Sequence, residues 1–491
     1  MDVVNQWGRN LLRRLPMFVF GLSACGAEPM PALPPGSSAG TGAPQQANSE
    51  SGSGGSIAPV SMGSSGTIAA AAGTSAPAPA GSSAPATAGS SGPVTPAMPG
   101  EVSYHKDIRP LIEGRCVGCH FDGGSGPFPL TNWGEVSPQR GAVVIAVMTR
   151  KMPPWLADDS GCTPIRDDQR LTDAQLALFS TWQAGGFPEG NEADFVPLPK
   201  PTQREIGEPS MIIKATSPFQ LRAGIEDYYC LNTDANLTED TWVTAMDMVP
   251  EQNAYVHHAI VNVGGLTCSA LGIGSENIYS YRPGSRTLVF EEGDALLLPA
   301  RSSIRIQFHY NTKFAPRGQT LPTDHSAFRI WTLPKGQRPA RQITRMPHHD
   351  MSISIPVGAV DKREGGTSSI GREYTPAGAE IIGISPHMHY LGQRFKETLT
   401  LADGTDHCLV NIPDWDQDWQ LDYFFEPSSY IKVASGARVA QECYYSNRAE
   451  DQGKDPEGNP FTPAYTTYGE DTRQEMCLGY IWFRYPLSGG L

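Results

Sequence analysis

The chain has 491 residues, of which 39% are hydrophobic and 18% are charged, and its formal net charge at pH 7 is −14. This length exceeds that of one ordinary domain, so we expect several. The negative charge argues against a nucleic-acid partner, because phosphate binding needs a face rich in lysine and arginine.

Residues 1–25 have the layout of an export signal. Three arginines precede a short apolar stretch, which ends at Leu22-Ser23-Ala24-Cys25. This ending resembles the box of a bacterial lipoprotein, in which the cysteine receives a lipid. The apolar stretch is too short to span a bilayer. We therefore expect export to the periplasm or the cell surface, with Cys25 as the only attachment to a membrane. A plain secretory signal is the alternative.

Residues 26–100 consist almost entirely of Gly, Ser, Ala and Pro, and Glu28 and Glu50 are their only charged residues. Such a stretch has little apolar surface to bury, so we expect a flexible linker. It would hold the folded part of the chain away from a membrane surface.

Residues 101–193 contain the segment Cys116-Val117-Gly118-Cys119-His120. The C-x-x-C-H spacing is the attachment signature of c-type haem, in which two thiols bind the vinyl groups and the imidazole binds the iron. A redox-active C-x-x-C and half of a zinc site are the alternatives. The chain has no second C-x-x-C, and export favours haem. We expect a small cytochrome c-like domain.

Two methionines near the end of this domain are candidates for the sixth iron ligand. Met152 lies in a Pro-rich loop before the last helix, and we predict that it is the ligand. Met148 ends an apolar helical run, and we predict that it packs in the core. The pattern Thr172-x-x-Gln175 predicts a capping box at the start of the last helix.

From residue 205 onward the pattern changes to strands. Residues 303–310 alternate with period two, and similar short runs separated by Gly and Pro continue to the C-terminus. This pattern predicts β-sandwiches. The length of the region favours two, covering 205–340 and 341–491. The predicted fold is therefore a small all-α cytochrome c-like domain followed by two mainly antiparallel, jelly-roll-like β-sandwiches.

His387 and His389 stand one residue apart in a segment that reads as a strand. Side chains i and i+2 of a strand point to the same face, so both imidazoles can bind one metal ion. Imidazole suits copper, zinc, iron or nickel, so this pair alone does not choose the metal. Two half-exposed surface histidines are the alternative.

Further residues in this half form a set with the pair: His257-His258, Gln307-Phe308-His309-Tyr310, the stretch from His387 to Gly392, and Glu475-Met476-Cys477. The set resembles the copper type II, ascorbate-dependent monooxygenases, which include peptidylglycine α-hydroxylating monooxygenase and dopamine β-hydroxylase. That family carries a His-His pair, Q-x-H-Y, H-x-H before an apolar residue and Gly, and E-M-C, in the same order. The resemblance covers roughly residues 205–491.

The resemblance implies one copper ion in each sandwich, with the two ions facing across a cleft. It assigns His257, His258 and His309 to a copper ion that stores and delivers electrons. It assigns His387, His389 and Met476 to a copper ion that activates O2, since soft sulfur favours Cu(I). Gln307 matches a family position near the first ion, and Tyr480 matches one that contacts substrate.

Two features of the sequence qualify this assignment. Adjacent residues of a regular strand face opposite sides, so His257 and His258 can share a metal only at a bulge or a strand end. The peptide-amidating relative has an arginine where this chain has Ser385, so we do not expect a peptidyl-glycine substrate. A second adjacent pair, His348-His349, follows Pro347 and precedes Asp350, and we predict that it lies in a solvated loop.

Six cysteines remain as disulfide candidates in an exported protein: Cys162, Cys230, Cys268, Cys408, Cys443 and Cys477. The resemblance implies the pairs Cys230–Cys268 and Cys443–Cys477. It offers no counterpart for Cys162 and Cys408.

These observations predict a copper-dependent monooxygenase with two copper ions and one haem c per chain, which hydroxylates a C–H bond of a small-molecule substrate with O2. Electrons would come from an ascorbate-like reductant or a redox protein, with the tethered haem as a relay. The alternative is a non-catalytic copper and haem lipoprotein that transfers electrons or handles copper.

Overall fold

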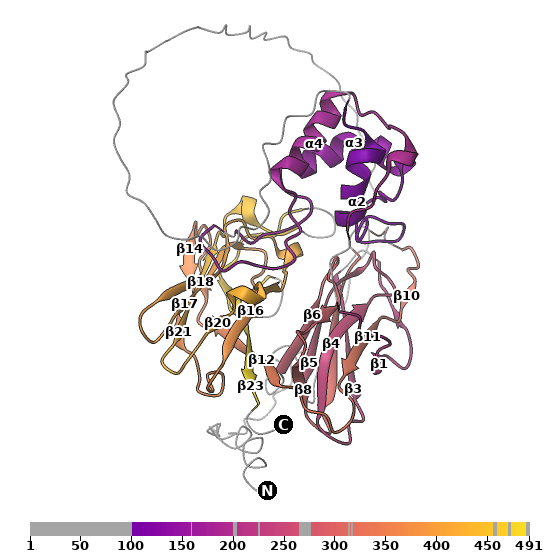
Figure 1. Cartoon of the computed structure of the whole chain (residues 1–491). Coiled ribbons are helices and arrows are strands. Elements are labelled where there is room, and N and C mark those ends of the chain that lie inside the picture. The colour runs from indigo at the N-terminus through magenta and orange to yellow at the C-terminus, as the bar shows by residue number, and fades with distance from the viewer. Residues whose placement is uncertain are drawn as a thin grey trace, which may run out of the picture. The chain divides into compact units, whose positions relative to one another are not determined.

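The computed structural model describes residues 101–158, 160–199, 204–223, 226–264, 276–312, 315, 318–454, 459–469 and 473–487 (Figure 1). All of them belong to one compact unit of the chain. The expected signal, the lipid site at Cys25 and the linker lie outside the described residues. No helix in the described part is long and apolar enough to cross a membrane.

The first described part is helical. It comprises η2 (Tyr104–Ile108), α2 (Arg109–Arg115), α3 (Trp133–Met148), α4 (Asp173–Ala184) and η3 (Glu192–Asp194). Phe179 and Trp182 of α4 are fully buried in the core that these helices share. The predicted capping box is confirmed, because the Thr172 and Gln175 side chains accept from each other's backbone N–H groups. Two otherwise unpaired donors of the first turn are thereby satisfied.

Met148 is the last residue of α3, and its exposed fraction is 44%. The prediction that it packs in the core is therefore wrong. Val144 and Val147 supply the buried side of this helix end. Met148 stands at the end of α3, where the chain passes into exposed residues 149–151 and no further helical turn covers it. Met152 is half-buried in the loop that follows.

The rest of the described chain is rich in strands, as the sequence predicted. The largest sheet has ten strands in the order β1–β11–β4–β8–β12–β23–β16–β19, with β7 beside β4 and β20 beside β16. Their bounds are β1 (Met211–Lys214), β4 (Thr241–Val249), β7 (Leu288–Val289), β8 (Asp294–Leu298), β11 (Ala327–Thr332), β12 (Arg341–Asp350), β16 (Glu380–His387), β19 (Tyr423–Phe424), β20 (Ile431–Lys432) and β23 (Cys477–Pro486).

Two smaller sheets pack against this large sheet, one in each half. The first is β3–β9–β5–β6, with bounds β3 (Glu226–Asp234), β5 (Val256–Val263), β6 (Glu276–Tyr281) and β9 (Ser303–Asn311). In the second, β14 and β15 both pair with β21, and the order continues through β17 to β18. Its bounds are β14 (Lys362–Glu364), β15 (Thr367–Ser369), β17 (Gly392–Thr400), β18 (Asp406–Ile412) and β21 (Arg438–Tyr445).

The short pairs β2 (Phe219–Gln220) with β10 (Thr323–Asp324), and β13 (Ser354–Ile355) with β22 (Thr466–Thr467), complete the strands. Three-residue turns η4 (Gln417–Trp419), η5 (Pro427–Ser429) and η6 (Ala449–Asp451) join them.

Each half has its own apolar core between two facing layers. In the first half, Phe328 of β11 and Ile306 of β9 are buried in one cluster, so the large and small sheets pack face to face. In the second half, Phe483 of β23 and Phe395 of β17 do the same. The halves share the large sheet through β8 and β12, which run parallel with Asp294 opposite Arg341.

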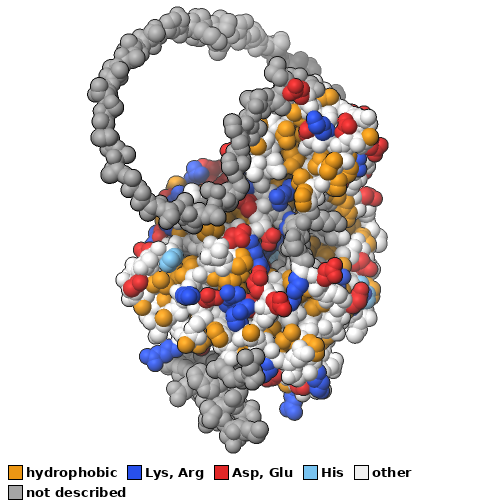
Figure 2. Space-filling view, in the orientation of Figure 1, with side chains coloured by type: hydrophobic (Ala, Val, Ile, Leu, Met, Phe, Trp, Pro, Cys, Tyr) orange, Lys and Arg blue, Asp and Glu red, His pale blue; other side chains and the backbone are white. Residues whose placement is uncertain are grey.

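The segment after α3 is tied to the second half. Cys162 and Cys408 form a disulfide with a Cα–Cα distance of 4.5 Å. Beside it, the N–H of Thr163 donates to the Cys408 carbonyl at 2.9 Å. The sequence left these two cysteines unassigned, and the fold pairs them. On the face shown in Figure 2, acidic and basic side chains are interspersed rather than separated by sign.

Candidate metal centres

The first centre begins with an irregularity in β5. In its pairing with β9, Val256 lies opposite Tyr310 and His258 lies opposite His309, so His257 is skipped in the register. Such a bulge lets neighbouring residues turn to the same side. The fold therefore provides the condition that His257 and His258 need to share a metal.

Three imidazoles converge at this bulge. The Nδ1 atom of His258 lies 3.2 Å from Nδ1 of His257 and 3.3 Å from Nδ1 of His309. One ring nitrogen of each residue lies within 4.8 Å of the others. Nitrogens bound to one ion at about 2.0–2.1 Å in a near-tetrahedral arrangement would stand roughly 3.3 Å apart. The three rings thus have the spacing of a shared metal site.

The surroundings hold these rings in place. His309 is 1% exposed, and its ring stacks on Tyr228 with centroids 4.4 Å apart. The far nitrogen of His257, Nε2, donates to Oδ1 of Asp418 at 3.1 Å. Burial, followed by the neighbouring imidazoles, lowers the pKa of His258 well below its usual value. A neutral imidazole is the form that binds a metal.

In the second centre the ring nitrogens that face each other are Nε2, whereas in the first they are Nδ1. The Nε2 atoms of His387 and His389 lie 3.2 Å apart. Nδ1 of His387 donates to the side-chain oxygen of Gln420, and Nδ1 of His389 donates to the Gln474 carbonyl at 3.0 Å. Because each Nδ1 carries the hydrogen, each Nε2 presents its lone pair to the other ring. Burial, followed by the charge of His389, lowers the pKa of His387 to about 3.

Met476, the third predicted ligand of this centre, lies just before β23, the strand that pairs with β16. In that pairing His387 lies opposite Leu478, and His389 and Met476 follow just beyond this last pair of the ladder. The exposed fraction of Met476 is 8%. The buried carboxylate of Glu475 accepts from the backbone N–H of His389 at 2.9 Å and from that of Met476 at 3.3 Å. One side chain therefore fixes the backbone of two predicted ligands.

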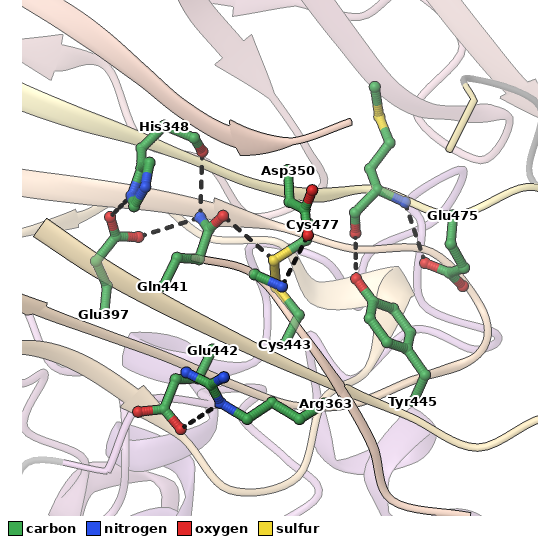
Figure 3. The surroundings of a disulfide bond; sticks show 12 residues. His348, Asp350, Arg363, Glu397, Gln441, Glu442, Cys443, Tyr445, Glu475 and Cys477 are labelled. Carbon is green, nitrogen blue, oxygen red and sulfur yellow. Dashed lines mark hydrogen bonds and ion pairs between the residues drawn. A yellow bond between two sulfur atoms is a disulfide. The ribbon is translucent and has the colours of Figure 1, made fainter. Parts of the chain in front are cut away.

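A disulfide supports the strand that follows Met476 (Figure 3). Cys443 and Cys477 are bonded, with a Cα–Cα distance of 5.8 Å, and this implied pair is confirmed. The hydroxyl of Tyr445 donates to the Met476 carbonyl at 2.8 Å. Cys230 is also disulfide-bonded, while its expected partner Cys268 lies outside the described residues.

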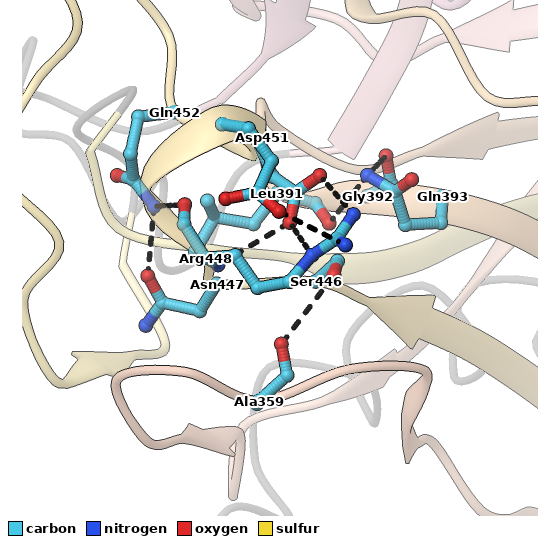
Figure 4. Close-up of polar contacts among 10 residues, drawn as sticks. Ala359, Leu391, Gly392, Gln393, Ser446, Asn447, Arg448, Asp451 and Gln452 are labelled. Atoms are coloured by element: carbon cyan, nitrogen blue, oxygen red, sulfur yellow. Dashed lines mark hydrogen bonds and ion pairs between the residues drawn. The ribbon is translucent and has the colours of Figure 1, made fainter.

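The turn between β16 and β17 also contacts the loop that follows β21 (Figure 4). The N–H of Ser446 donates to the Leu391 carbonyl at 2.9 Å, and its hydroxyl donates to the Ala359 carbonyl at 3.4 Å. Arg448 and Asp451 form an ion pair at 2.7 Å in the adjoining loop. These contacts stabilise the turn that begins at His389.

Gln307 and Tyr480, the two predicted site residues that are not metal ligands, lie on β9 and β23. Gln307 is half-buried on β9, on the same face as His309 two residues on. Tyr480 is half-buried on β23, opposite Ser385.

Sequence reasoning missed Arg345, which lies beside Tyr480. Its guanidinium carbon stands 4.5 Å from the centre of the Tyr480 ring and 4.2 Å from that of Trp482, and its Nη2 donates to Ser385 at 3.1 Å. The signal available in the sequence was an arginine two residues after the apolar Ile343, a spacing that puts both side chains on one face of a strand.

The predicted loop at His348-His349 is wrong, because both residues lie on β12, and only His349 is exposed. His348 is 5% exposed and has its Nδ1 2.6 Å from Oε1 of the fully buried Glu397 (Figure 3). Pro347 suggested a loop, but β12 pairs with β8 only over Arg341–Ile343. A missing N–H is tolerated where a strand edge is unpaired.

The C-x-x-C-H segment forms a compact turn after α2. Cys116 and Cys119 are half-buried thiols, and the N–H of His120 donates to the Cys116 carbonyl at 2.9 Å. Nδ1 of His120 donates to the Phe128 carbonyl at 2.9 Å, which leaves Nε2 as the nitrogen available to iron. A Cβ on Gly126 would stand 2.6 Å from the His120 ring, so this approach requires glycine. The donors and the fixed imidazole fit a c-type haem.

The same segment contacts the first half. A Cβ at Gly284, three residues beyond the end of β6, would lie 3.2 Å from Sγ of Cys119. β6 pairs with β5, with Tyr281 opposite Ala259, the residue after His258. The C-x-x-C-H turn therefore lies against the end of the strand next to the one that carries His257 and His258.

No protein-family model matches the chain, and no curated protein matches it. Solved structures with partial similarity include the STIV MCP, at 8% identity over 56% of this chain and 96% of that one, with a TM-score of 0.21. A chain of Sulfolobus turreted icosahedral virus matches at 10% identity over 57% and 92%, with a TM-score of 0.21. One of infectious bursal disease virus Gx strain matches at 10% over 60% and 76%, with 0.19. Similarities this low support no argument on function.

Proposed function

We propose that the chain is a copper-dependent monooxygenase with an attached c-type haem. The reaction would convert R–H, O2, two electrons and two protons into R–OH and water. The observation that carries this proposal is the convergence of ring nitrogens in two separate histidine clusters, through Nδ1 in one and Nε2 in the other. The motif resemblance supplies the identity of the metal.

The chain's own residues divide the work as follows. His257, His258 and His309 would hold one copper ion, and His387, His389 and Met476 would hold the other. Bound copper supplies one-electron and O2 chemistry, which no side chain offers. The thioether of Met476 favours Cu(I) at the second centre, and the Glu475 carboxylate keeps the Met476 and His389 backbones in register.

The haem-binding residues would be Cys116, Cys119 and His120, with Met152 as the sixth ligand. The contact between Cys119 and Gly284 supports a role for the haem as an electron relay to the first centre. Gly284 lies just beyond the end of β6, and β6 pairs with β5, the strand that carries His258. The external donor would be an ascorbate-like reductant or a redox protein. The two disulfides, Cys162–Cys408 and Cys443–Cys477, favour an exported protein.

The test is oxygen uptake by the reduced, copper-loaded protein against a library of small molecules, with copper and haem counted in the same preparation. Two copper ions and one haem per chain, together with substrate-dependent oxygen uptake, are the expected result. Stoichiometric copper without uptake for any substrate would favour the non-catalytic lipoprotein. A folded protein that binds no copper at either cluster would contradict the proposal.

A further inference from the structure

One short turn of the second half contacts both histidine clusters. Asp418 lies within η4, and its Oδ1 accepts from Nε2 of His257 in the first cluster at 3.1 Å. Gln420 follows two residues later, and its Oε1 accepts from Nδ1 of His387 in the second cluster. The two clusters come from different halves of the strand-rich part, and η4 bridges them.

The turn is held in shape by its own hydrogen bonds. Asp416 caps it by accepting from the N–H of Asp418 at 2.9 Å, and Nε2 of Gln420 donates to the Gln417 carbonyl at 2.9 Å. Trp415, which precedes it, is 7% exposed and packs in the core of the second half. The turn therefore presents Asp418 and Gln420 from a fixed backbone.

The two partners differ in charge. A carboxylate that accepts the far N–H of a ligating imidazole makes that ligand more basic and stabilises the more highly charged metal ion. A neutral amide orients the imidazole with a smaller effect on its basicity. His257 receives the carboxylate, whereas His387 receives the amide.

We infer that the η4 turn is a shared positioning element, which sets the spacing of the two histidine clusters and makes the first centre the stronger reductant. Asp418 and Gln420 act through His257 and His387 and contact no reacting atom. This inference rests on the proposed function. With both ions bound, this order of potentials would favour the first centre as the electron donor to the second.

Taken alone, the contact between His257 and Asp418 could be explained as an ordinary ion pair at the surface. The Asp418 side chain is 58% exposed, and ion pairs at the surface contribute little to stability. A chance surface pair does not explain the second contact, in which Gln420 of the same segment accepts from His387 of the other cluster. The effect to measure is therefore on the metal centres and not on stability.

The test uses the full copper-loaded chain and the variants Asp418→Asn, Gln420→Glu and Asp414→Asn. Asn at 418 keeps an oxygen acceptor and removes the charge. Asp414 is the matched control, because it is exposed and makes no hydrogen bond or ion pair within the described chain. The reduction potential of each copper ion is measured by a redox titration followed by electron paramagnetic resonance.

We expect Asp418→Asn to weaken Cu(II) relative to Cu(I) at the first centre by about tenfold or more, and each factor of ten raises that potential by about 59 mV. Gln420→Glu should lower the potential of the second centre. Asp414→Asn should move neither. The double variant Asp418→Ala/Gln420→Ala should broaden the Cu(II)–Cu(II) dipolar signal, because both anchors of the spacing are lost.

Equal shifts in Asp418→Asn and Asp414→Asn would overturn the inference, since the effect would then be one of overall charge. Unchanged potentials in both Asp418→Asn and Gln420→Glu would overturn it as well. These results are distinct from failure of the proposed function, in which the parent protein itself binds no copper. If Asp418→Asn does not fold, Gln420→Glu still tests the inference through the potential of the second centre.

Discussion

The buried carboxylate of Glu475 accepts a hydrogen bond of 2.9 Å from the backbone N–H of His389. The same group accepts from the N–H of Leu391 at 2.6 Å and from that of Met476 at 3.3 Å. Glu475 comes just before β23, whereas His389 follows β16, so one side chain ties the ends of two neighbouring strands together where the second histidine cluster lies.

Replacing Glu475 should test this tie. In Glu475→Gln, the amide NH2 group would face N–H donors, so at least one buried donor loses its acceptor. We expect the free energy of unfolding to fall by about 1–3 kcal/mol, and copper affinity at the second centre to fall more than at the first. Chemical denaturation and copper competition would measure the two effects.

The matched control is Glu442→Gln, which breaks the ion pair between Glu442 and a half-exposed Arg363 (Figure 3). Surface pairs of this kind contribute about 0–1 kcal/mol. Losses of equal size in the two variants would show that Glu475 is not a special anchor of the centre.

Met152 and Met148 should respond differently to replacement by alanine. Met148→Ala removes a side chain that is 44% exposed, so stability should change by no more than about 0.5 kcal/mol. Met152→Ala should change the ligation of the iron and shift the haem potential. Absorption spectra and a redox titration of both variants show which methionine binds the iron. A shift of the haem potential in Met148→Ala alone would reverse our assignment.

Gly284 offers a test of the contact with the C-x-x-C-H turn. A side chain at this position would press on Sγ of Cys119, so Gly284→Val should move the turn and slow the reoxidation of reduced haem by copper. Gly358→Val is the control, because Gly358 has a similar backbone (φ of 78° against 82°) and open space around its Cβ position. Stopped-flow absorbance would follow the haem. Equal rates in the two variants would remove the support for a relay.

Glu397 should make stability depend on pH. Burial raises the pKa of this carboxyl above its ordinary value of 4.5, and the His348 pair opposes that shift. Because the folded state holds the proton more tightly than the unfolded state, this contribution to stability is complete below about pH 4.5 and declines as pH rises through the folded pKa.

The corresponding measurement compares the parent with Glu397→Gln, which cannot titrate. Unfolding free energies measured from pH 4 to 8 should fall more steeply with rising pH in the parent. Parallel curves would show that Glu397 has the same pKa in both states.

Local pattern was sufficient for some features and not for others. The capping box at Thr172 and the alternation through His309 depend on neighbouring residues, so the sequence predicted them. Whether His257 and His258 share a side depends on a bulge, which the pairing of β5 with β9 decides. The disulfide between Cys162 and Cys408 joins residues 246 positions apart in the sequence, so no pattern of neighbouring residues could predict it.

The same limit applies to the partners of the ligands. His348 was misplaced because Pro347 is a local break signal, while the compensating Glu397 comes from another strand. Asp418 and Gln420 lie in a segment that reads as a polar loop around two tryptophans. Only the fold brings that loop to His257 and His387.

Met476 decides between an enzyme and a binding protein. Met476→His would replace a soft thioether with an imidazole, so copper should still bind through three nitrogens. The preference for Cu(I) should be lost, and with it substrate hydroxylation. Ile212→His is the control, because Ile212 is 59% exposed and lies on β1, at the opposite end of the large sheet from β23 and β16. It should keep both the Cu(I) preference and the activity. Copper affinity in each oxidation state and oxygen uptake with the identified substrate are the measurements. If Met476→His turned over at the parent rate, Met476 would be an ordinary core residue, and the oxygen chemistry would have to take place elsewhere in the protein.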